Sequence, residues 1–146
     1  MRFALRVCAS LVILLAVLGL TAWISAPQGH TWLELRDAGT GRRIVSLDLR
    51  EGEEVVLTWM NSLFGLMVTE VFVARSGILE LTRITFADPG GEEPPLVRPG
   101  DVDDLYHTGG PFRAEGLSKP VSRVIFRVGE IGNPTIRIGN ELVHLA

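Results

Sequence analysis

The sequence predicts an all-β domain, either an antiparallel sandwich or a partly open barrel of about eight short strands, preceded by one N-terminal transmembrane or signal helix. Three observations support this fold class. Short segments with alternating apolar and polar residues recur after residue 30, with turn-forming clusters between them. The same region contains no long stretch with a helical period of 3.6 residues. Before it lies a long uncharged apolar run.

This apolar run divides the chain into residues 1–30, a membrane anchor or signal segment, and residues 31–146, a β domain. The run covers residues 7–26, which is about the ~20 residues that a helix needs to cross a bilayer. A secretory signal has an apolar core of only ~7–15 residues before its cleavage site. Ala26 could end such a site, but Pro27 would then follow the cut. An uncleaved anchor is therefore favoured, with a cleaved signal as the alternative.

The charges near the N-terminus predict the orientation. Arg2 and Arg6 are the only Lys, Arg, Asp or Glu residues before residue 31, and basic residues beside an apolar segment stay in the cytoplasm. Trp23 fits the aromatic belt at the opposite membrane interface. We expect a single-pass cell-membrane protein with its N-terminus in the cytoplasm and its C-terminal domain in the periplasm, or an exported protein if the segment is cleaved. The lipid bilayer is its predicted partner through residues 7–26.

The first half of the β domain contains five predicted strands. Alternation is clear in the second strand, where Val45, Leu47 and Leu49 share a face. The short connection at residues 75–77, which contains glycine, is typical of a hairpin. The five predicted strands cover residues 31–36, 42–49, 54–60, 66–74 and 78–87.

The alternation stops between Asp88 and Lys119. The first part of this stretch, residues 88–101, is rich in proline and glycine, so we expect that part to run extended over the surface. A short helix within residues 101–118 is compatible with Asp101 as its N-cap. Three more strands are predicted at residues 121–129, 134–139 and 141–146, the last two joined by a turn at residues 139–140.

Charge and cysteine content exclude some classes of function. The chain has 14 basic residues, of which Arg2 and Arg6 precede the β domain, so 12 remain there beside all 17 acids and give a formal charge of −5. An acidic domain without a basic stripe predicts no nucleic-acid partner. Cys8 is the single cysteine and lies in the apolar run, so no disulfide can form within the chain.

No motif of a known enzyme class is present. The chain lacks a G-x-S-x-G elbow, a phosphate-binding P-loop, an H-E-x-x-H pair and a C-x-x-C pair. We therefore expect no cofactor, no metal and no catalytic residue.

The segment DVDDLYHTGGPF, residues 101–112, is the candidate that concentrates the most polar chemistry. If it is helical, Asp103, Asp104 and His107 share a face, and Glu70 could complete a metal site. The alternative is an ordered turn in which Tyr106 packs and the Gly-Gly pair supplies positive φ angles. The turn is favoured, because zinc usually takes histidine and cysteine ligands and no cysteine is available outside the apolar run.

The connection between the third and fourth predicted strands is the second candidate. Ser62 and His107 with an acid could form a nucleophilic set, but a serine at a strand end is more often a turn residue. The connection is unusually apolar, so it either folds back on the domain or presents a contact surface. Glu70 lies in mid-strand, where it either points to solvent or faces a groove with an arginine or backbone donor as its partner.

The pattern N-S-x4-M-V-x-E at residues 61–70 resembles the H-S-x4-P-V-x-E motif of the domain-of-unknown-function family 1850. Ser62, Val68 and Glu70 match that motif, and residues 77–86 resemble the family's following strand. The resemblance extends over residues 31–146. It implies a small exported protein of unestablished function, similar to proteins encoded beside tripartite ATP-independent periplasmic transporters of the TAXI type.

Two positions depart from the motif, because Asn61 replaces His and Met67 replaces Pro. Asparagine does not titrate near neutral pH and is a poor metal ligand, whereas histidine titrates in this range and binds metals well. A role shared at this position is therefore a hydrogen bond, not proton transfer or metal binding.

These observations predict a binding or docking module that is accessory to a solute transporter, with the transporter's membrane subunit or its solute-binding protein as partner. The predicted surface combines the 61–70 connection with the 88–118 loop. Two alternatives remain, a metal-dependent or hydrolytic envelope enzyme and a purely structural envelope protein. The predicted binding residues are Asn61, Ser62, Glu70, Asp104 and His107, and the alternative enzyme would use Glu70, Asp103, Asp104 and His107.

Overall fold

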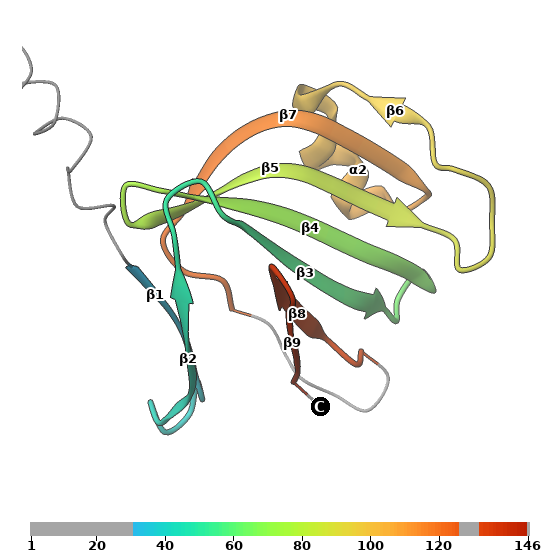
Figure 1. Cartoon of the computed structure of the whole chain (residues 1–146). Helices are drawn as coiled ribbons and strands as arrows, with labels where there is room; N and C mark the ends of the chain where they lie inside the picture. The colour runs from blue at the N-terminus through green and yellow to red at the C-terminus, as the bar shows by residue number, and fades with distance from the viewer. Residues whose placement is uncertain (1–30, 126–131, 146) are drawn as a thin grey trace, which may run out of the picture.

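The computed structural model describes residues 31–125 and 132–145 (Figure 1). The predicted membrane segment lies outside these residues, and none of the helices within them is long and apolar enough to span a bilayer. The described elements, in chain order, are β1 (Thr31–Arg36), β2 (Arg43–Leu49), β3 (Glu54–Asn61), β4 (Leu66–Arg75), β5 (Ile78–Ala87), β6 (Leu96–Val97), η1 (Pro99–Asp101), α2 (Val102–Thr108), β7 (Phe112–Val121), β8 (Thr135–Ile138) and β9 (Glu141–His144).

The strands form two sheets, which confirms the prediction of a mostly β domain. β1 and β2 pair with each other, and the other strands form a seven-stranded sheet in the order β6-β7-β5-β4-β3-β8-β9. Neither sheet of the described residues closes into a barrel. The prediction of purely antiparallel pairing is wrong at one place, because β6 runs parallel to β7. In this strand order β4 lies in the middle of the large sheet, where β3 pairs with one of its edges and β5 with the other.

The predicted hairpin turns are confirmed. β4 and β5 are joined by Ser76 and Gly77, whose φ angles of 51° and 79° belong to the tight turns that match strand twist. Gly139, with a φ of 52°, starts the turn between β8 and β9. In the turn between β1 and β2, the Asp37 carboxylate accepts hydrogen bonds from the backbone N–H and the hydroxyl of Thr40, both at 2.7 Å.

One face of the large sheet carries two apolar clusters, because alternate residues of a strand point to the same face. The hairpin cluster, named for the β1–β2 hairpin that covers it, includes Leu47, Leu57 and Phe72. The helix cluster, named for α2, includes Phe86 and Val102. Figure 1 shows the hairpin and α2 at opposite ends of the large sheet. We call the sheet face that carries both clusters the inner face.

Two irregularities keep apolar residues on this face. In β5 the register shifts between Leu81 and Arg83, so that Leu81 and Ile84 both point inward although they are three residues apart. The hydroxyl of the bulged Thr82 donates to the Val71 carbonyl at 3.1 Å. A second irregularity in β7 contains Gly116, whose φ is 68°. Such bulges increase bending and twist, and β5 and β7 are visibly curved in Figure 1.

The region after β5 differs from the prediction. No strand was predicted between residues 88 and 119, where the alternation stops, but this region contains β6, η1, α2 and most of β7. The strand expected at 121–129 is wrong in its first half, because β7 ends at Val121 and residues 122–125 are not in a strand. Residues 126–129 lie outside the described residues. Gly116 shifts the alternation inside β7, which is why the sequence pattern hid this strand.

The short helix expected within residues 101–118 is confirmed as α2, but its predicted cap is not. Asp101 occupies the N-cap position without a side-chain hydrogen bond to the helix. Its carboxylate instead accepts from the Arg98 guanidinium at 3.0 and 3.1 Å. Val102 is buried, and Leu105 and Tyr106 also pack on the helix cluster, so this side of α2 faces the sheet.

Candidate functional site

Glu70 lies on the inner face in the middle of β4. Its cross-strand neighbours are Leu57 on β3 and Ile84 on β5, which belong to the hairpin cluster and the helix cluster respectively. A carboxyl group is therefore placed at the junction of two apolar clusters. Of the two orientations expected for this residue, the solvent-facing one is wrong.

Burial and one hydrogen bond determine the electrostatics of this carboxyl. Burial raises the pKa of Glu70 above its usual value, because the charged form loses water. A hydrogen bond with the Trp59 side chain partly opposes this rise in pKa. Among the described residues no arginine, lysine or histidine forms an ion pair with Glu70. The Trp59 side chain, in place of the expected arginine or backbone donor, is therefore the group that favours the charged form of Glu70.

Tyr106 of α2 is the second polar neighbour of Glu70. Burial raises the pKa of the Tyr106 hydroxyl, and the negative charge of Glu70 raises it further, so the two groups lie within electrostatic reach of each other. The Tyr106 ring packs edge-on against Phe86 with ring centroids 5.2 Å apart. Phe86 is fully buried and stacks on Phe112 at 4.8 Å. This aromatic packing fixes α2 and with it the position of Tyr106.

The turn between β3 and β4 is closed by Asn61. Its side-chain oxygen accepts from the backbone N–H groups of Leu63 and Phe64 at 3.0 and 3.3 Å. Ser62 is exposed at this turn, and Leu63 is 80 % exposed. Asn61 therefore shapes the turn as expected for a residue that bonds its own backbone.

The apolar turn both folds back and exposes an apolar side chain, in line with the two possibilities expected for it. Phe64 packs on the helix cluster and meets Gly109 directly after α2, whereas Leu63 points away from it. The turn at residues 61–65 and the segment at 101–110 are thus neighbours in space. This contact brings together the two segments from which the predicted surface is composed.

The remaining candidates lie on the outer side of α2. Asp103, Asp104 and His107 are all exposed, and Asp103 pairs with Lys119 at 3.4 Å. Glu70 faces the sheet interior, so the four side chains proposed for a metal or hydrolytic site do not converge. Within residues 31–125 and 132–145, no group of three or more acidic, histidine or cysteine side chains is placed to hold a metal ion. Asp104 and His107 lie on the exposed side of α2, whereas Glu70 lies on the inner face of the sheet.

Trp59 and Tyr106 are the site residues that sequence reasoning missed. Tyr106 was assigned to packing alone and Trp59 was not named as a candidate, although each carries a polar atom close to Glu70. A signal existed for Trp59, since it shares a strand face with Val55 and Leu57 in the pattern of β3. Tyr106 gives no such signal, because its proximity depends on how α2 packs on the sheet.

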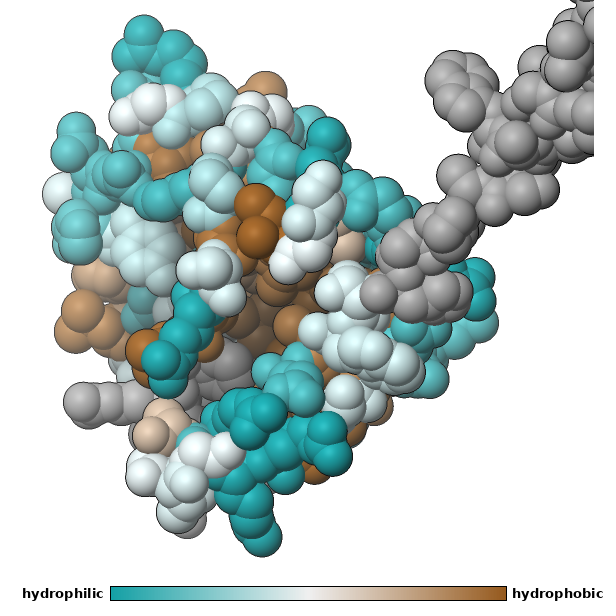
Figure 2. All heavy atoms as spheres, turned by 90° about the vertical axis from the view of Figure 1, so that its left-hand side faces the viewer, coloured by the Kyte–Doolittle hydropathy of each residue, from teal (hydrophilic) through white to brown (hydrophobic). Residues whose placement is uncertain are grey.

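The surface is hollowed on the side that carries the β1–β2 hairpin. Figure 2 shows there a hollow with a hydrophobic floor and a hydrophilic rim. Several residues of the hairpin cluster are only partly buried, among them Leu33 and Val45. The two-stranded sheet therefore covers its part of the large sheet incompletely.

Comparison of the chain with protein-family models, with curated proteins and with solved structures gave no significant match.

Proposed function

We propose that residues 31–146 form an extracytoplasmic binding module that its N-terminal segment holds at the membrane, and that this module is an accessory to a solute transporter of the TAXI type. The observation that carries the binding proposal is Glu70, a partly buried carboxyl between two apolar clusters that has no basic partner among the described residues. Removal of a charged group from water is costly unless a partner compensates it.

The groups around Glu70 favour a particular kind of ligand group. A carboxylate is an acceptor of hydrogen bonds, and a donor with positive charge gives the strongest bond to it. Trp59 and Tyr106 place an indole N–H and a hydroxyl near this carboxyl, and neither group carries a positive charge. A basic side chain of a protein partner, or an ammonium group of a solute, would therefore supply the positively charged donor that Glu70 lacks among the described residues.

The surface around the site suits a macromolecular partner. Leu63 is an apolar side chain at the tip of the turn, and the contact of Phe64 with Gly109 holds this turn beside α2. Asp104 and His107 add exposed polar groups on the outer side of the same helix. An exposed apolar anchor next to polar groups is the usual composition of a docking surface.

The proposed link to a transporter rests on the resemblance of residues 61–70 to the family 1850 motif. Asn61 closes the turn through two hydrogen bonds, a role that requires an acceptor and no titration. This supports a structural role for the first motif position, Asn61.

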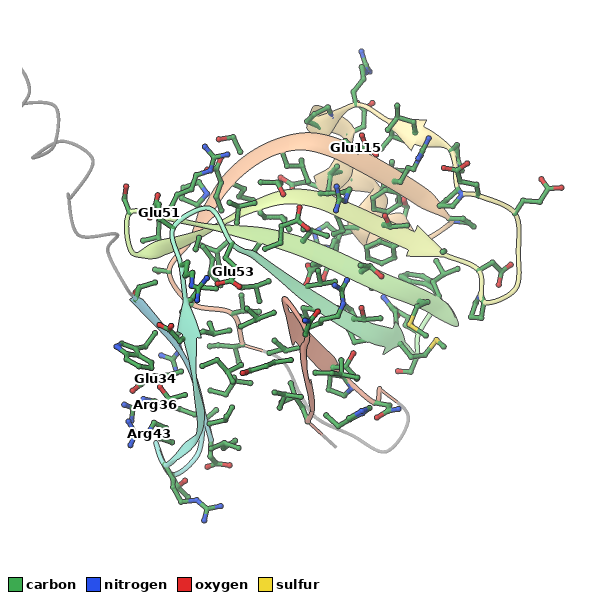
Figure 3. All side chains as sticks on the ribbon, viewed as in Figure 1. Glu34, Arg36, Arg43, Glu51, Glu53 and Glu115 are labelled. Atoms are coloured by element: carbon green, nitrogen blue, oxygen red, sulfur yellow. The ribbon has the colours of Figure 1, made fainter. Side chains whose placement is uncertain are left out.

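The test is recovery of a tagged full-length chain from native membranes in mild detergent, with co-purified proteins identified by mass spectrometry. We expect a transporter membrane subunit or a solute-binding protein with the wild-type chain, and at least a severalfold lower yield of it with Glu70→Gln. Glu115→Gln is the matched control, since Glu115 follows the inward-facing Ala114 on β7 and points to the opposite face (Figure 3). Recovery of the chain alone, or equal losses for both variants, would refute the proposal.

A further inference from the structure

The β1–β2 hairpin has an outer face that no other described element covers. Trp32 and Ile44 are 64 % and 61 % exposed there, although both are large apolar residues. Glu34, Arg36 and Arg43 also project from the hairpin away from the large sheet (Figure 3). We call these five residues the hairpin outer face.

An ion-pair cluster forms the polar part of the hairpin outer face. The Arg36 guanidinium donates to the Glu34 carboxylate at 2.9 Å, and Arg43 approaches the same carboxylate at 3.4 Å. Two arginines therefore share Glu34, and the exposed Asp48, the cross-strand neighbour of Trp32, is the second acid of this face, so that its formal charges balance while the whole β domain carries −5. Hydrogen bonding to Arg36 lowers the pKa of Glu34, which keeps this cluster ionised.

The length of chain before β1 limits how far this face can be from the membrane. The apolar run ends at Ala26 and β1 begins at Thr31, so only residues 27–30 connect them. An extended chain spans at most ~3.3–3.6 Å per residue, which gives a reach of roughly 17 Å over this connection. If the apolar run crosses the bilayer, the start of β1 lies no farther than this from the end of the hydrocarbon core, which brings Trp32 within reach of the lipid headgroups.

We propose that the hairpin outer face rests on the outer leaflet of the membrane, with Trp32 and Ile44 in the boundary between headgroups and acyl chains and with Arg36 and Arg43 on lipid phosphates. Tryptophan prefers this boundary, and arginine can keep its charge in the headgroup layer while its stem lies along apolar material. This inference rests on the proposed membrane anchor.

Such docking also orients the domain. α2 and the turn between β3 and β4 lie at the other end of the molecule from the hairpin (Figure 1). With the hairpin on lipid, the surface around Glu70 is held away from the bilayer, where a partner in the periplasm can reach it.

Site-directed spin labelling of the full-length chain in vesicles tests the docking. Cys8→Ser removes the single native cysteine, and Ile44→Cys or Leu96→Cys then supplies one labelling site. Leu96 is the matched control, because it is equally exposed at 61 % and lies on β6 at the edge of the large sheet. The vesicles contain phosphatidylcholine and phosphatidylglycerol, and the readout is the accessibility of the label to oxygen relative to a water-soluble nickel chelate.

We expect a higher ratio of oxygen to nickel accessibility at position 44 than at position 96. Vesicle flotation in a density gradient shows whether the chain is bound to the membrane. Equal accessibility ratios at the two positions in a chain that floats with the vesicles would overturn the docking and leave the anchor intact. A chain of full intact mass that does not float would overturn both the anchor and the docking. Unchanged thermal unfolding of the two labelled variants verifies that the comparison concerns the native fold.

Discussion

The ring of Phe64 lies directly against Gly109, so that a Cβ atom built on this glycine would come within 2.5 Å of the ring. This contact joins the turn after β3 to the end of α2, two segments more than 40 residues apart in the sequence. It depends on the absence of a side chain at position 109 and on a φ of 75° that L-residues rarely adopt. The close approach of the two halves of the proposed surface therefore depends on this glycine, in addition to the packing of α2 on the helix cluster.

Gly109→Ala should lower the free energy of unfolding by about 2–4 kcal/mol, because it combines backbone strain with a collision against Phe64. Gly100→Ala is the matched control, since Gly100 has no positive φ and a methyl group there would meet no atom within 4 Å. We expect that control to change stability by less than ~0.5 kcal/mol. Urea unfolding of the full-length chain in detergent, followed by circular dichroism, compares the two; similar losses would contradict the assigned contact.

Asn61→Ala should destabilise the chain by about 1 kcal/mol, because two backbone N–H groups of the turn lose their acceptor. Asn61→Asp keeps an acceptor oxygen at the same position and should retain most of this stability. The same unfolding measurement applies. Equal effects of the two substitutions would show that the side-chain hydrogen bonds do not hold the turn.

The pH dependence of stability follows from Glu70. A carboxyl whose pKa is raised by folding stabilises the folded state fully below its unfolded pKa, and this contribution is lost as the pH rises through the folded pKa. Glu70→Gln cannot ionise, so its stability relative to wild type should increase from acidic pH, near the ordinary value of 4.5, toward neutral pH. The gain is about 1.4 kcal/mol for each pH unit by which folding raises the pKa.

Unfolding of the two proteins between acidic and neutral pH measures this difference. Glu115→Gln, on the opposite face, is the control for the substitution itself. A stability difference between Glu70→Gln and wild type that stays constant with pH would mean that Glu70 is not desolvated in the folded chain.

The fold was predictable from the sequence where alternation was undisturbed. The five strands before residue 88 and the turn at Ser76 and Gly77 were predicted within one or two residues, because local pattern and turn chemistry agree there. β7 was not predictable, since Gly116 shifts its alternation and its pairing with β5 is a long-range contact.

The candidate site was predictable only in part. Asn61 and Glu70 were named from a short motif, but the inward direction of Glu70 was hidden because Val71, which follows it, is also buried on the other face. Trp59 lies near Glu70 because β3 pairs with β4 and the two residues share a sheet face. The proximity of Tyr106 to Glu70 arises when α2 packs on Phe86, and no local pattern records such packing. The exposed acids and histidine of α2 were also considered for a metal or hydrolytic site with Glu70, which the orientation of the helix does not support.

Photocrosslinking from the turn between β3 and β4 tests the binding module most directly. A photoreactive residue replaces Leu63, 80 % exposed at the turn, or Leu142, 54 % exposed on β9, and the full-length chains are irradiated in native membranes. We predict a crosslink from position 63, and not from position 142, to a transporter membrane subunit or a solute-binding protein. No crosslink from position 63, or the same crosslinked proteins from both positions, would contradict the proposed binding surface.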